Sequence, residues 1–126
     1  MIGYVTLGTN DIEKAAAFYD ALLGELGATR VMEMETFIAW ATDPNQPALS
    51  VTKPNDGNAA TVGNGVMVAL IADSNDKVDA IYAKAIELGA TDEGPAGPRG
   101  DTGFYAGYFR DLDGNKLNVF CMTPQS

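Results

Sequence analysis

The residue types that most often do chemistry in small enzymes are nearly absent from this chain. There is no histidine among its 126 residues and only one cysteine, Cys121. Serine–histidine and cysteine–histidine nucleophile systems are therefore excluded within one chain, because each needs an imidazole base. A zinc site made of imidazoles or several thiolates is excluded for the same reason. A lone cysteine cannot form an internal disulfide, which is typical of a reducing compartment and predicts a cytoplasmic location.

Three other patterns match known chemical motifs only in part. Residues 111–115 begin like a calcium loop, but the glycine is fourth rather than sixth and Met122 stands where the bidentate glutamate belongs. Residues 63–65 are glycine-rich but lead into a predicted strand rather than a helix, so they are no dinucleotide loop. Glu33 and Glu35 would share one strand face with no evident proton-transfer partner. We therefore assign no catalytic residue and predict no cofactor.

The charge of the chain limits its partners. Seventeen acidic and 8 basic residues give a formal net charge of −9, which repels nucleic acid and anionic membranes and slightly favours a cationic ligand. Apolar runs such as residues 66–72 are far too short to span a bilayer. The chain begins directly with a strand-like segment, without the pattern of a signal peptide. We expect a small-molecule partner, and neither nucleic acid nor membrane.

The elements that must position any site occur twice. At this length one domain is expected, and residues 4–19 align with residues 67–82 at an offset of 63. The alignment gives five identical pairs: Val5 and Val68, Leu7 and Leu70, Lys14 and Lys77, Ala17 and Ala80, Tyr19 and Tyr82. After a gap of one residue, residues 26–29 match residues 88–91. The chain therefore contains two copies of one structural unit.

Each copy opens with an apolar strand, residues 4–8 or 66–72, and continues into an amphipathic helix. Asn10, with Glu13 three residues later, is predicted to cap the first helix. Ser74 is predicted to cap the second helix. A glycine follows the last apolar residue of each helix, where a left-handed C-cap is favoured.

Three strand-like segments follow each helix, at residues 30–34, 36–42 and 48–53 in the first copy and at residues 90–93, 104–110 and 116–122 in the second. Asp113–Gly114 joins the last two as a hairpin turn. The sequence thus predicts an α+β fold in one domain, residues 1–126, with two βαβββ modules. The modules cover about residues 1–53 and 65–124, and residues 54–64 form the linker between them.

Four stretches spread over nearly the whole chain, residues 4–19, 63–69, 78–80 and 103–115, resemble the glyoxalase/bleomycin-resistance/dioxygenase (vicinal oxygen chelate) superfamily. The resemblance implies that the two modules form a cupped mixed sheet, with the helices on the convex face and a small-molecule cavity on the concave face. Members often pair as homodimers, sometimes with exchanged units. A homodimer is therefore also expected.

The resemblance further implies where a metal site would lie. Metal-using members place a histidine on the first strand of each unit and a glutamate on the last strand, and these positions hold Tyr4, Met67 and Asn118. A fourth such position falls at Ser50. A phenol, a thioether, an amide and a hydroxyl supply no charge at neutral pH, so they compete poorly with water for a divalent ion. The chain is identified as a degenerate member without the metal ligands.

Strand alternation indicates what the concave side contains instead. Tyr4, Met67, Asn118 and Phe120 are predicted to face it together, which gives a mostly apolar surface of the kind that binds small ligands. Ser50, Trp40 and Tyr108 complete the candidate ligand contacts, although core packing or a dimer contact would also explain Trp40. Cys121 should point to the opposite face as a small buried side chain.

The leading hypothesis is a metal-independent family member that binds a small apolar or aromatic ligand in the cup. One alternative is a metal-independent lyase- or isomerase-like enzyme with Tyr4 as its acid, although no general base is visible. Another is a protein-interaction module whose cup is filled by its own side chains.

Overall fold

The structure, a computed structural model, describes residues 1–122 and divides the chain between Val62 and Gly63 into two compact units. Each unit has one helix and four strands among the described residues. The first unit contains β1 (Tyr4–Gly8), α1 (Ile12–Gly24), β2 (Thr29–Glu33), β3 (Phe37–Ala41) and β4 (Ala48–Thr52). The second contains β5 (Val68–Ile71), α2 (Asn75–Glu87), β6 (Thr91–Pro98), β7 (Phe104–Arg110) and β8 (Lys116–Met122). The predicted α+β class with two βαβββ units is confirmed.

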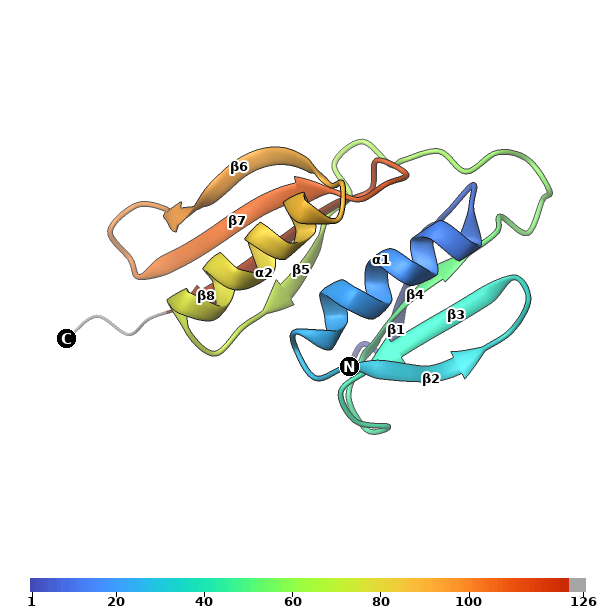
Figure 1. The fold of residues 1–126 in the computed structure, drawn as a ribbon, viewed down its shortest axis with the longest axis horizontal. Coiled ribbons are helices and arrows are strands. Elements are labelled where there is room, and N and C mark those ends of the chain that lie inside the picture. The colour runs from blue at the N-terminus through green and yellow to red at the C-terminus, as the bar shows by residue number, and fades with distance from the viewer. Residues whose placement is uncertain (123–126) are drawn as a thin grey trace. The chain divides into compact units, whose positions relative to one another are not determined.

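The two units have the same topology. In the first sheet the strand order is β1-β4-β3-β2, with β1 parallel to β4 and the other pairs antiparallel. In the second sheet the order is β5-β8-β7-β6, with β5 parallel to β8 and the other pairs antiparallel. Helix α1 packs on one face of the first sheet and α2 on one face of the second (Figure 1). We call this side of each sheet its helix face and the opposite side its open face.

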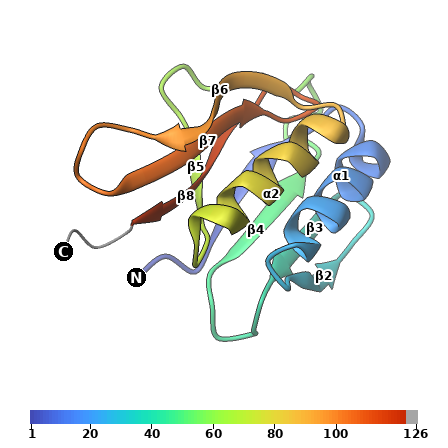
Figure 2. The ribbon, with the colours of Figure 1, turned by 60° about the vertical axis from the view of Figure 1, so that its left-hand side comes forward.

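The helix faces form the cores of the units. In the first unit the buried residues of α1 cover Ile38, Trp40 and Val51. In the second unit α2 lies across its sheet (Figure 2). Three apolar side chains of α2, Val78, Ile81 and Ala85, are buried between the helix and the sheet. Neither helix of residues 1–122 is long and apolar enough to cross a membrane.

Two strand boundaries differ from the prediction by two residues or more, and several others differ by one. Strand β5 begins at Val68 rather than at residue 66, because Val66 donates a backbone hydrogen bond to Gly63 in a turn. Strand β6 extends to Pro98, well beyond the predicted residues 90–93. Its glycines and prolines are compatible with a bulged strand at the edge of the sheet, where a missing N–H does not break the ladder. Residues 123 and 124 of the second predicted module lie outside the described residues.

The predicted cap of α1 is wrong by one residue. Asp11, not Asn10, is the N-cap, and its carboxylate accepts a hydrogen bond from the Lys14 N–H. Asn10 instead pairs with the backbone of Ala60, accepting from its N–H at 2.7 Å and donating to its carbonyl oxygen at 3.2 Å. The predicted cap of α2 is confirmed, because the Ser74 hydroxyl accepts from the N–H of Lys77.

Candidate ligand-binding site

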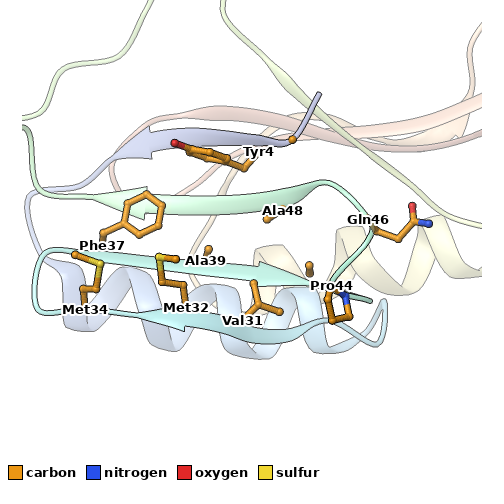
Figure 3. Close-up of a pocket in the computed structure, with 11 residues that line it drawn as sticks. Tyr4, Val31, Met32, Met34, Phe37, Ala39, Pro44, Gln46 and Ala48 are labelled. Atoms are coloured by element: carbon orange, nitrogen blue, oxygen red, sulfur yellow. The ribbon is translucent and has the colours of Figure 1, made fainter. Parts of the chain in front are cut away.

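A pocket of about 540 Å³ lies on the open face of the first sheet (Figure 3). Small-molecule pockets in proteins commonly have volumes of about 300–1,000 Å³. Residues from all four strands and from the β3–β4 turn line it: Gly3, Tyr4, Val31, Met32, Met34, Phe37, Ala39, Ala41, Pro44, Gln46 and Ala48. Its size and its place beside strand ends make it the leading candidate for a ligand site in the first unit.

The lining is chemically simple. Tyr4 and Gln46 carry its polar side chains, and none of its lining residues carries a carboxylate or a basic group. Phe37 meets Tyr4 edge to face, with ring centroids 6.2 Å apart and an interplanar angle of 86°. Met32 and Met34 add two flexible thioether side chains, which adapt to apolar shapes and contact aromatic rings well. The pocket is therefore suited to an apolar or aromatic molecule with one or two polar atoms.

Strand pairing explains why these side chains meet. Residues 37, 39 and 41 alternate with the buried Ile38 and Trp40, so the first set lies on the open face and the second on the helix face. A bulge between Arg30 and Met32 brings Met32 opposite Ala39, whereas Arg30 remains opposite Trp40. The bulge therefore turns Met32 toward the pocket.

Trp40 does not belong to this pocket. It is 1% exposed on the helix face, packs against Tyr19 of α1, and donates its Nε1–H to Asp20 Oδ1 at 2.8 Å. Arg30 also donates to both carboxylate oxygens of Asp20, at 2.9 and 2.7 Å. These hydrogen bonds, the one from Arg30 first, lower the pKa of Asp20 below its ordinary value against the opposing effect of burial. Trp40 is a core residue that fixes β3 to α1, and the sheet separates it from the pocket.

Ser50 lies on the open face, opposite Ala39 and Thr6, but outside the pocket lining. It is fully buried on β4, and its hydroxyl donates to the carbonyl oxygen of Val5 at 2.7 Å. The Thr6 hydroxyl oxygen lies 2.9 Å from the Ser50 hydroxyl oxygen. Ser50 is absent from the pocket lining, so of the candidate residues in the first unit only Tyr4 lies there. In residues 1–122 the Tyr4 hydroxyl makes no hydrogen bond, and the residue is 63% exposed.

The candidates in the second unit lie on or beside its open face. Asn118 and Phe120 of β8 share that face with Tyr108, because Tyr108 and Asn118 are cross-strand partners. Asn118 is 2% exposed, whereas Phe120 is half-buried and stacks on Phe104 with centroids 5.7 Å apart. Met67 is exposed and immediately precedes β5. As predicted, Cys121 is buried on the opposite, helix face.

Comparison with known proteins identifies the family of the chain. The sequence profile of the Glyoxalase/Bleomycin resistance protein/Dioxygenase superfamily matches residues 1–119. The chain belongs to this superfamily. A glyoxalase/bleomycin resistance protein from Albidiferax ferrireducens T118, known from its crystal structure, is 35% identical to it, with a TM-score of 0.88 over 98% of this chain and 99% of that chain. Comparison with curated protein sequences gave no match.

More distant structures share the fold alone. The genomically encoded fosfomycin resistance protein FosX from Listeria monocytogenes is 17% identical, with a TM-score of 0.75 over 98% of this chain and 93% of that chain. A lactoylglutathione lyase from Agrobacterium tumefaciens is 21% identical, with a TM-score of 0.70 over 96% of this chain and 92% of that chain. These similarities confirm the fold expected from the sequence.

The positions that the superfamily implies for metal ligands hold poor donors in this member. Tyr4, Met67, Asn118 and Ser50 provide a phenol, a thioether, an amide and a hydroxyl, none of which is an anionic or imidazole ligand. The Ser50 hydroxyl is moreover engaged with a backbone carbonyl. Among residues 1–122, no group of three or more His, Cys, Asp or Glu side chains lies together as a metal site would require. The donor set at these positions does not fit a divalent transition metal.

Proposed function

We propose that this protein binds a small apolar or aromatic molecule in the pocket of the first unit and does so without a metal ion. The observation that carries the proposal is the pocket of about 540 Å³, which is lined by apolar side chains and lacks charged ones. Burial of an apolar ligand against Met32, Met34 and Phe37 would supply most of the binding free energy. Tyr4 and Gln46 would orient the ligand through hydrogen bonds.

The superfamily relationship supports a small-molecule ligand. The protein that is 35% identical over nearly its whole length bears the name of a glyoxalase/bleomycin resistance protein. The neutral side chains at the metal-ligand positions support binding rather than metal-dependent isomerisation or oxygenation.

The proposal is tested by titration with Nile red, a neutral aromatic dye whose fluorescence increases in apolar surroundings. We expect saturable binding at one site. Ala48→Leu should weaken binding by about tenfold or more, because Ala48 lines the pocket and the larger side chain occupies part of it. Ala83→Leu makes the same change at an exposed position of α2 and should leave the affinity unchanged. Dye binding that does not saturate, or that is insensitive to Ala48→Leu, would contradict the proposal.

A further inference from the structure

The second unit contains a buried amide oxygen without a hydrogen-bond partner. Asn118 lies on β8, an inner strand of its sheet, and is 2% exposed. Its Oδ1 is the one buried side-chain polar atom of the described residues that is left unpaired. Burying a carbonyl oxygen away from water without a replacement hydrogen bond destabilises a folded protein. A leucine of similar volume would avoid that penalty, so the amide needs a reason other than packing.

The first unit shows how a buried polar group at the equivalent position is paired. In the first unit, Ser50 is the counterpart of Asn118, and its cross-strand partner Thr6 supplies a hydroxyl 2.9 Å from the Ser50 oxygen. In the second unit, the residue at the corresponding register position opposite Asn118 is Ala69, which has no polar group. The first unit therefore satisfies its buried polar group internally. The second unit gives the buried Oδ1 of Asn118 no such partner.

Two aromatic residues, Tyr108 and Phe120, share the open face with Asn118. Tyr108 is the direct cross-strand partner of Asn118 on β7, and Phe120 lies two residues along β8 on the same face. Both rings are half-buried, and Phe120 stacks with Phe104. Flat apolar surfaces beside a single polar group favour an aromatic ligand that carries one hydrogen-bond donor.

Two cationic side chains near the Tyr108 ring limit which donor group a ligand could carry. The guanidinium of Arg99 lies 5.4 Å and the ammonium of Lys116 lies 5.6 Å from the centre of the Tyr108 ring. The ring is therefore already engaged by cations of the protein itself. A ligand ammonium would be repelled at this place, so the donor is a hydroxyl or an uncharged N–H group.

We propose that Asn118 Oδ1 is the acceptor for a hydroxyl or neutral N–H group of an aromatic small molecule that binds on the open face of the second sheet. Its residues and its polar recognition differ from those of the apolar pocket in the first unit. The proposal does not rest on ligand binding in that pocket.

The test compares 2-naphthol with 2-methoxynaphthalene, which has the same ring system but no donor. Isothermal titration of the full chain should show that 2-naphthol binds about tenfold more tightly, because only 2-naphthol can pair the buried oxygen. The preference should persist in Ala48→Leu, since that variant alters only the first pocket. Asn118→Leu should abolish the preference while the protein remains folded.

A second variant tests the same oxygen without removing it. Ala69→Thr introduces the arrangement of Thr6 and Ser50 into the second unit, at an exposed position. The new hydroxyl should pair with Asn118, raise the melting temperature and reduce the preference for 2-naphthol. Thr6→Ala, the reverse change in the first unit, should leave the preference unchanged. Equal affinity for the two compounds, no binding of either, or a preference that survives Asn118→Leu would each overturn the proposal.

Discussion

Single residues on the two faces of the first sheet differ in how their polar groups are used. On the helix face, Trp40 and Arg30 donate three hydrogen bonds to the one carboxylate of Asp20. On the open face, the Tyr4 hydroxyl is exposed and has no partner within the described residues. Polar groups of the helix face therefore hold α1, β2 and β3 together, whereas the Tyr4 hydroxyl on the open face takes no part in holding the unit together.

Asp20→Asn should lower the melting temperature at neutral pH by about 2–5 °C, because the charge-assisted bonds of Arg30 are weakened. The folded-state pKa of Asp20 lies below its ordinary value, so its stabilisation is present above pH about 4 and is lost as pH falls through the folded-state pKa. The melting temperature of the wild type should therefore approach that of Asp20→Asn in acid. Circular dichroism melts from pH 7 to pH 3 measure this. Glu35→Gln, at an exposed position, serves as the control, and an unchanged gap at pH 3 would contradict the prediction.

At the scale of elements, hydrophobic spacing predicts the helices, most strands and their order. Alternation also places Tyr4 and Asn118 on open faces and Cys121 on a helix face. These predictions succeed because helix and strand periods are local properties of the chain. The family and its fold follow from motifs that span most of the sequence.

The pocket itself could not be predicted in the same way. Met32 reaches it only because a bulge shifts the register of β2, and nothing in the local sequence specifies that bulge. Met34 lines the pocket from beyond the end of β2, outside any regular alternation. The spacing of Phe37, Ala39 and Ala41 does predict part of the pocket lining, because these residues alternate with Ile38 and Trp40 and therefore face the other side of the sheet. The sequence does not show that α1 covers Trp40, which makes this aromatic residue part of the core and not of the pocket lining.

The packing of α2 on β7 depends on a glycine. A Cβ atom at Gly107 would lie 2.9–3.1 Å from three atoms of Tyr82, so helix and strand would have to separate. Gly107→Ala should therefore lower the free energy of unfolding by about 1–3 kcal/mol. Gly24→Ala is the matched substitution at the end of α1, where an added Cβ meets no atom within 4 Å. It should be neutral or stabilise by up to about 1 kcal/mol. Urea unfolding midpoints measure both, and similar effects at the two sites would contradict the packing argument.

The whole molecule repeats one topology with two different open faces. The first unit presents an apolar pocket and satisfies its buried Ser50, whereas the second presents the unpaired oxygen of Asn118 among aromatic rings. Duplicated units keep their helix faces because each needs a core. Their open faces can diverge, since one fold can carry different surface sites.

The proposed metal independence concerns the entire chain, because histidine is missing throughout and not only at the four positions. With no histidine and one buried cysteine, transition metals would depend on carboxylates, and residues 1–122 contain no group of three such ligands. Zinc, nickel or manganese should therefore shift the melting temperature of tag-free protein by less than about 1 °C. A site saturated a hundredfold above its Kd would add about 2.7 kcal/mol and shift it by several degrees. The tag must be removed, since a histidine tag would supply the imidazoles that the chain lacks. Removing metal with a chelator should leave Nile red affinity unchanged, and a stoichiometric transition metal retained after dialysis would refute this prediction.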